Sequence, residues 1–248
     1  MNALNNACTS TFMRLGREGR SEEVVRRMIE LIELGVFAEG EQLPSESELA
    51  LQFGVATVTL REALVGLRQR GLIETRRGRN GGSFVRAPQE TPRDLLLARL
   101  LQMSALELRD LGDEQLAISA TAARLAARRA TAEHHARLLH HVEALGRGAS
   151  RRERRRADAH FHIEIAVAAQ SVRLSNAAMR LQAELGELLW LDVEAAEAAA
   201  VQQEHRALLA ALQAGDANLA GALAEAHVNR SIKRLLERRL AQLAATAD

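Results

Sequence analysis

The chain has 248 residues, 47% hydrophobic content and a formal net charge of +1 at pH 7. This length suits two modest domains with a real core, and the apolar content excludes wholesale disorder. No apolar run has the length of a membrane span, the N-terminus lacks a hydrophobic signal core, and a single cysteine excludes an intrachain disulfide. We therefore expect a soluble cytoplasmic protein that has no membrane partner.

The first residues, 1–20, are polar and without a repeating pattern, which is typical of a flexible arm. Ser21 is suited to cap the helix that follows, and Gly35 is suited to end it. The apolar residues of this helix recur at helical spacing, so one face should be buried beneath the next elements; they are Val24, Val25, Met28, Ile29 and Ile32.

Two short helices are predicted next, each from a capping box in which a hydroxyl residue precedes a glutamate by three positions. Ser45 with Glu48 marks the first start, and Thr59 with Glu62 marks the second. Gly54 lies between them, where a tight turn needs a residue without a Cβ atom. The apolar residues that we expect these helices to bury are Leu49, Ala50, Phe53, Leu60, Ala63, Leu64 and Leu67.

A basic hairpin is predicted after the second helix. Residues 72–75 and 83–85 have the composition of short strands, and three arginines stand beside three glycines in the loop between them. Such a loop suits a wing that lies close to a phosphate backbone. A solvated surface hairpin is the alternative, but two helices joined at a glycine and followed by a basic wing favour DNA binding. The predicted winged helix-turn-helix domain spans residues 21–86.

The segments GEQLPSESELALQFGV, TLREAL and GLIETRRGRNGGSFV resemble the winged helix-turn-helix of the GntR-type bacterial regulators, over about residues 20–86. The resemblance implies binding to double-stranded operator DNA. Many relatives carry arginine where Ser47 and Thr57 stand, whereas Arg61 matches the remaining recognition-helix arginine of the family. The predicted DNA-binding residues are Ser45, Ser47, Thr57, Val58, Thr59, Arg61, Arg76, Arg77, Arg79, Asn80 and Gly81.

The rest of the chain has the composition of a helical bundle. A short linker, residues 87–92, contains two prolines, and from residue 93 onward there is no proline while alanine, leucine, arginine and glutamate dominate. We expect a mainly α protein whose second domain, residues 93–243, is an antiparallel bundle of six or seven helices. The predicted helices are about 93–104, 106–111, 113–129, 132–145, 151–169, 173–192, 200–213 and 216–243, of which the second is short enough to merge with a neighbour.

Four residues of this bundle form a candidate metal site. Asp158 and His162 are four positions apart and share one helix face. His205 and His227 lie on two later helices among apolar neighbours. One carboxylate and three imidazoles are suitable ligands for a divalent transition metal. The alternative is that these histidines are ordinary core or surface residues. We interpret His134, His135, His140 and His141 as solvated, and His160 is not a candidate because it points away from Asp158.

The segments DAHFHIEIAVAAQS and EHRALLAALQAGDANLAGALAEAH resemble the FCD effector-binding domain of the FadR-like branch of the GntR regulators, over about residues 93–243. The resemblance implies that the same four residues hold zinc, nickel or a similar ion, and that a small carboxylate effector completes the coordination. Relatives often have an arginine and a glutamate where Gln115 and Ser119 stand. These two residues and Arg124 are the predicted effector-binding residues.

Together these features predict a homodimeric transcriptional regulator, because one small winged module binds DNA weakly and two half-sites supply useful affinity. The family resemblance implies repression that the effector relieves as the commoner mode, and activation stays open. Three alternatives stay open. The metal ion itself is the signal, the metal is structural or absent, or the bundle is a metal-dependent hydrolase. The last finds no support in the sequence, which has no H-E-x-x-H motif and no evident general base.

Overall fold

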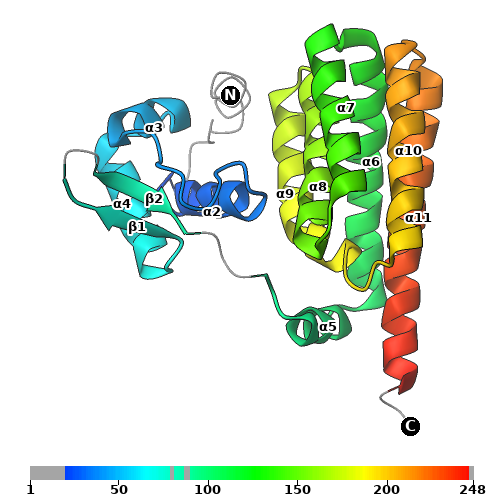
Figure 1. The fold of residues 1–248 in the computed structure, drawn as a ribbon, viewed down its shortest axis with the longest axis horizontal. Coiled ribbons are helices and arrows are strands. Elements are labelled where there is room, and N and C mark those ends of the chain that lie inside the picture. Colours follow the sequence, from blue (N-terminus) through cyan, green and yellow to red (C-terminus); the bar gives the residue numbers. More distant parts are fainter. Residues whose placement is uncertain (1–19, 79–80, 87–89, 246–248) are drawn as a thin grey trace. The chain divides into compact units, whose positions relative to one another are not determined.

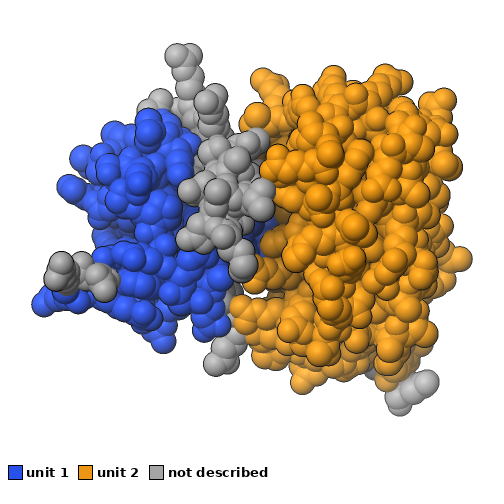
Figure 2. All heavy atoms as spheres, turned by 45° about the horizontal axis from the view of Figure 1, so that its top comes forward, with its two compact units in different colours: residues 1–89 blue, residues 90–248 orange. Residues whose placement is uncertain are grey.

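The chain folds into two compact units, residues 1–89 and residues 90–248 (Figures 1 and 2). The computed structural model describes residues 20–78, 81–86 and 90–245. The predicted arm, up to residue 19, and part of the predicted linker lie outside the described residues. The division between the units falls within the predicted linker, and each unit is described by itself below.

The first unit contains three helices and a hairpin among its described residues: α2 (Arg20–Glu33), α3 (Glu46–Phe53), α4 (Thr57–Gln69), β1 (Ile73–Arg76) and β2 (Gly82–Val85). The strands pair antiparallel, with Ile73 opposite Val85 and Arg76 opposite Gly82. α2 and α3 both pack against α4. This is the order of elements that the sequence predicts for a winged helix-turn-helix.

The turn between α3 and α4 forms as the sequence predicts, but the start of α4 does not. Ser45 caps α3 in a full capping box with Glu48, and Gly54 ends that helix in the left-handed conformation, with φ of 66°. The predicted helix start at Thr59 is wrong, because α4 begins at Thr57 behind Ala56, which offers no side-chain cap. The Ala56 carbonyl already accepts a hydrogen bond from the Leu60 amide, so helical hydrogen bonding begins three residues before Thr59. Ser21 likewise lies inside α2 and not before it.

The core of the first unit is the predicted one. Phe53, Leu60, Leu64 and Leu67 are essentially inaccessible to solvent. Burying side chains of this size stabilises a fold by about 1.5–3 kcal/mol each relative to leaving them in water.

In the described part of the chain, no single helix is long and apolar enough to span a membrane. One pair of helices, α3 and α4, has the required length and composition when taken together, but the pair is bent by 106°.

The described part of the second unit is a bundle of seven helices (Figure 1). They are α5 (Arg93–Gln102), α6 (Ala105–Arg129), α7 (Ala132–Arg147), α8 (Arg151–Ala168), α9 (Val172–Leu189), α10 (Ala195–Gln213) and α11 (Ala217–Ala245). α8 packs against α6, α7 and α9, while α10 packs against α6, α7 and α11. These contacts bring α8, α10 and α11 around one buried region.

Two predicted boundaries in the bundle are wrong. The helix predicted to begin at residue 200 is α10, which begins at Ala195, behind Glu194. The predicted helices 106–111 and 113–129 are a single helix, α6, which runs through Gly112 without interruption. A Cβ atom on Gly112 would lie 3.0 Å from Ile232 Cγ1 on α11, which is tighter than ordinary contact. Gly112 therefore favours the close packing of α6 on α11, the most extensive helix pair of the bundle, and does not form a turn.

Candidate metal centre and nucleic-acid interface

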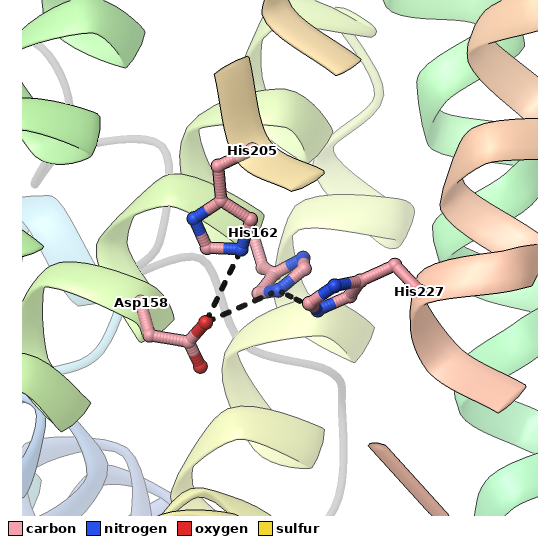
Figure 3. Close-up of side chains that lie close together, drawn as sticks. All are labelled: Asp158, His162, His205 and His227. Atoms are coloured by element: carbon pink, nitrogen blue, oxygen red, sulfur yellow. Dashed lines mark hydrogen bonds and ion pairs between the residues drawn. The ribbon is translucent and has the colours of Figure 1, made fainter. Parts of the chain in front are cut away.

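The four predicted metal ligands converge inside the second unit (Figure 3). Asp158 and His162 project from consecutive turns of α8, as their spacing requires, while His205 comes from α10 and His227 from α11. All four side chains are buried, and one potential ligand atom from each lies within 4.8 Å of the others. The arrangement offers one oxygen and three imidazole nitrogens to a common point.

The spacing of these atoms fits a single ion. Asp158 Oδ1 lies 3.3 Å from His205 Nε2 and 3.6 Å from His162 Nε2. His162 Nε2 in turn lies 3.1 Å from His227 Nε2. Ligands about 2.0–2.2 Å from a tetrahedral zinc ion are roughly 3.3–3.6 Å from one another. The three separations are therefore close to those of ligands that already surround an ion.

Burial and charge set the protonation of the site. Burial lowers the pKa of His205 to about 4, although the Asp158 carboxylate opposes the shift. Burial also lowers the pKa of His227. Burial alone would raise the pKa of Asp158, but contacts with His162 and His205 outweigh it and hold that pKa well below its usual value. Near neutral pH, Asp158 is ionised while His205 and His227 are neutral, which are the forms that bind a metal.

His205 is the residue whose environment most favours coordination. Its ring stacks on Phe161, with centroids 4.1 Å apart and planes 15° apart, so its orientation is fixed by packing. Its Nδ1 atom has no hydrogen-bond partner and its Nε2 atom contacts the Asp158 carboxylate at 3.3 Å, although the side chain is only 1% exposed. A buried polar atom without a partner costs about 1–3 kcal/mol. The Nε2 atom, which faces the Asp158 carboxylate, is the atom that would coordinate the ion.

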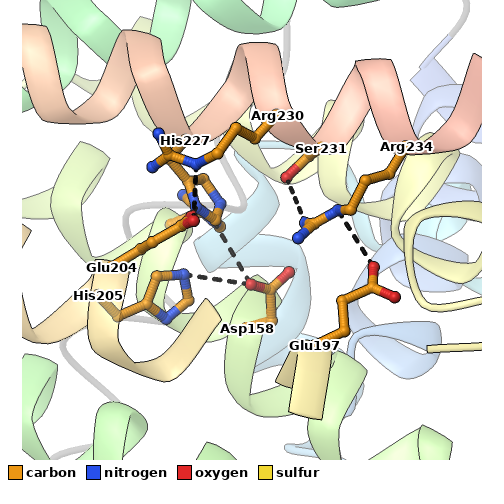
Figure 4. Close-up of polar contacts among 9 residues, drawn as sticks. Asp158, Glu197, Glu204, His205, His227, Arg230, Ser231 and Arg234 are labelled. Carbon is orange, nitrogen blue, oxygen red and sulfur yellow. Dashed lines mark hydrogen bonds and ion pairs between the residues drawn. The ribbon is translucent and has the colours of Figure 1, made fainter. Parts of the chain in front are cut away.

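Acidic and basic side chains of α10 and α11 surround the ligands (Figure 4). Glu204 Oε2 lies 2.6 Å from His227 Nδ1, and Glu204 Oε1 accepts a 2.6 Å hydrogen bond from Arg230 Nε. Farther along the same two helices, Glu197 pairs with Arg234 and Arg238. The sequence analysis missed Glu204. The only signal was its position beside His205, and helix periodicity does not reveal that it reaches a different helix.

The predicted effector residues do not share one environment. Gln115 is 3% exposed and lines a cavity beside His162, where its Oε1 atom has no hydrogen-bond partner. Ser119 lines the same cavity. Arg124 is not among the lining residues, and its guanidinium pairs with Glu225 at 2.6 Å. Sequence reasoning missed Gln182, which is equally buried, lines this cavity and also has an unpartnered Oε1 atom.

Two histidines that the sequence analysis interprets as solvated have structural contacts. His134 completes the cap of α7 with Thr131. His141 is half-buried against the rings of His140 and His160, and burial lowers its pKa to about 3. Among the described residues, none of these rings belongs to the group of four ligands.

In the first unit, the N-terminal part of α4 presents most of the predicted DNA-contacting side chains to solvent. Thr57, Val58 and Arg61 are exposed, and Thr59 is half-buried. Arg61 is held at 2.6 Å from Glu46 of α3. The other predicted residues of this region, Ser45 and Ser47, are exposed at the start of α3 with their hydroxyls 3.1 Å apart.

In the hairpin, Arg76 contacts neighbouring side chains, whereas Arg77 extends into solvent. Arg76 Nε bonds to Glu74 at 2.8 Å, and its guanidinium lies 4.2 Å from the centre of the Phe84 ring. Arg77 is exposed. A Cβ atom on Gly81 would approach the Arg76 carbonyl to 2.6 Å, so only glycine fits there. The predicted contacts Arg79 and Asn80 lie outside the described residues.

Replacing Arg76, Arg77 and Arg79 together by glutamine should flatten the salt dependence of DNA binding. Each lost phosphate contact lowers the slope of log affinity against log salt by about 0.9. Fluorescence anisotropy over a range of salt concentrations measures this slope. The matched triple lysine variant keeps the charge and should retain the slope. A glutamine variant with the parent's slope would show that the wing does not reach the DNA backbone.

Two family models match the chain, one in each unit. Residues 20–85 match the bacterial regulatory proteins of the gntR family, and residues 111–230 match the FCD domain. The chain is 42% identical over 224 residues to a Mycobacterium gastri protein named as the HTH-type transcriptional regulator RmpR, a match that spans 89% of this chain and 82% of that protein.

Two further similarities are narrower. The Klebsiella aerogenes HTH-type transcriptional repressor NanR is 42% identical over 64 residues, which are 26% of this chain and 25% of NanR. The solved structure of Escherichia coli McbR/YncC has the same fold, with a TM-score of 0.52 at 19% identity, and the match covers 90% of this chain and 99% of McbR/YncC. From its two matched models and its long match to RmpR, the chain belongs to the GntR family of DNA-binding transcriptional regulators and carries an FCD domain after its helix-turn-helix.

Proposed function

We propose that this regulator is a homodimeric repressor that leaves its operator when a small carboxylate binds beside a metal ion in the second unit. The observation that supports the proposal most is the convergence of Asp158, His162, His205 and His227 in a buried region. These residues would hold zinc, nickel or a similar ion. A single protein carboxylate is too little charge to neutralise a divalent ion, which leaves room for an anionic ligand.

The effector would bind where the cavity adjoins His162, and this cavity, with a volume of about 10 Å³ here, would have to widen to admit it. With Asp158 as the one anionic ligand, the loaded site would carry about one net positive charge, which favours a carboxylate over a neutral molecule. Gln115 and Gln182 line the cavity with amide oxygens that lack partners. They would orient the rest of the effector, because a buried acceptor gains most from a ligand that donates to it.

The proposed dimer and the proposed repressor role are supported by different observations. A single winged module gives weak binding, and two half-sites are the usual route to a specific affinity in the nanomolar range. The NanR proteins, which match this chain over the helix-turn-helix, are named repressors. Size-exclusion chromatography with light scattering, with and without operator DNA, tests the dimer.

A thermal-shift screen of small organic acids tests the effector proposal. The metal-loaded protein should be stabilised by one class of carboxylate, by about 2.7 kcal/mol at a hundred times the dissociation constant. The Gln115→Leu variant removes an amide from the cavity without touching a proposed ligand, so it should weaken this stabilisation while metal binding persists. A screen in which no carboxylate stabilises the loaded protein would contradict the proposal.

A metal-responsive regulator is the principal alternative, since the same four ligands would serve it. In that case the metal alone should release the DNA, without any organic acid.

The hydrolase alternative has less support. Glu164 follows His162 by two residues and would be the candidate general base. It is buried, and its Oε1 atom lies 3.0 Å from the guanidinium of Arg137. It therefore does not stand free as a general base.

A further inference from the structure

We infer that Glu204 is a positioning residue for the metal site, because it sets both the orientation and the tautomer of His227. This inference rests on the proposed metal site. Glu204 Oε2 lies 2.6 Å from His227 Nδ1, and the two side chains are only 19% and 7% exposed (Figure 4). The contact joins α10 to α11, so it ties two of the three ligand-bearing helices together.

The contact determines which nitrogen faces the other ligands. A neutral imidazole carries one proton, and an ionised carboxylate can only accept, so the proton must reside on His227 Nδ1 and be donated to Glu204. The Nε2 lone pair is then free. Nε2 is also the atom that lies 3.1 Å from His162 Nε2, on the side where the ligands meet. Metal-binding histidines are commonly held in this way, with the second ring nitrogen donating to a carboxylate.

Arg230 completes the arrangement. It lies three residues after His227, on the same face of α11, and its Nε donates to the other oxygen of Glu204 at 2.6 Å. Each oxygen of Glu204 therefore has one donor from α11, which fixes the carboxylate across the gap between the helices. Arg230 also offsets the charge of Glu204, so the carboxylate does not cancel the positive charge that an anionic effector requires.

His205 provides an internal contrast. It immediately follows Glu204 on α10, but its Nδ1 has no hydrogen-bond partner, and stacking on Phe161 holds its ring. Within the described residues, His227 is the one ligand histidine of α10 and α11 that contacts a carboxylate through its Nδ1 atom. The effect of removing Glu204 should therefore appear at His227 and not at His205.

Chelator competition with zinc measures the effect on metal affinity. The Glu204→Ala variant should bind zinc about 10–100-fold more weakly than the parent protein, as found when such partners are removed. Glu204→Gln should recover part of the loss, because its amide oxygen still accepts from Nδ1. The matched control is Glu197→Ala, two turns earlier on α10, which loses contacts to Arg234 and Arg238 but none to a proposed ligand. It should bind zinc as the parent does.

A tautomer measurement separates positioning from a general structural role. In the loaded parent protein, nitrogen-15 NMR of the imidazoles should show His227 protonated at Nδ1 and coordinated through Nε2. Coordination through Nδ1, or equal zinc affinity in Glu204→Ala, Glu197→Ala and the parent, would overturn the inference while leaving the metal site in place. A parent protein that binds no zinc would instead contradict the proposed function. The NMR test uses the parent chain, so it decides the matter even if Glu204→Ala does not fold.

Discussion

Replacing His205 or His227 by alanine should abolish tight metal binding and the response to an effector, while DNA binding without effector persists. Each substitution removes one of the four buried residues of the proposed metal site. The loss should exceed the 10–100-fold expected for removing a residue that only orients a ligand. The first unit should be unaffected, because it is compact by itself and has its own core around Phe53 and Leu60.

Metal analysis and operator titration of the same preparations check this expectation. The control is His140→Ala, which removes an exposed histidine of α7 that is outside the ligand group. It should retain both metal and response. Full metal content in the His205 or His227 variants would remove that residue from the site. A parallel loss of operator binding would show that the two units depend on each other for folding.

Replacing Arg61 by alanine should weaken operator binding by about 1–3 kcal/mol if its guanidinium makes a bidentate base contact. Arg61 lies in the second turn of α4, and its side chain is 65% exposed. Its pairing with Glu46 is an exposed ion pair, which contributes little in water and is easily given up to DNA. Arg61 is therefore available to reach a base edge.

Comparison of the operator with random DNA distinguishes the two kinds of contact. A base contact should weaken the operator complex more than the random complex, whereas a phosphate contact should weaken both equally. The Glu46→Gln variant is a second test of the same contact. It removes a carboxylate that competes for Arg61, so it should leave operator affinity equal to or above that of the parent. Unchanged affinity of Arg61→Ala for both DNAs would remove this residue from the interface.

Local patterns in the sequence predict much of the fold. The capping box of Ser45 with Glu48, the turn at Gly54 and the seven-helix bundle all follow from short-range rules, and the structure confirms them. Two local signals were misleading. From its neighbours in sequence, Gly112 is expected to end a helix. In the structure it lies inside α6, where the absence of a side chain leaves room for Ile232, a residue distant in sequence. Thr59 resembles a cap, but the backbone becomes helical two residues earlier.

The four candidate metal ligands could be predicted from the sequence. Asp158 and His162 follow from their spacing on one helix, and His205 and His227 follow from the family resemblance. The spacing of Asp158 and His162 places both on one face of α8. The contacts of Glu204 and Gln182 could not be predicted, because they depend on how α10 meets α11 and how α9 meets the cavity. Such pairings are set by the packing of whole helices, which helix periodicity alone does not determine.

The most direct test of the account is operator release by an organic acid, measured on one preparation before and after removal of metal. A carboxylate identified by thermal shift should release the operator from the zinc-loaded protein, fail to release it from the stripped protein, and release it again after zinc is restored. Zinc alone should leave the operator bound. Release of DNA from the stripped protein at the same acid concentration would contradict the account.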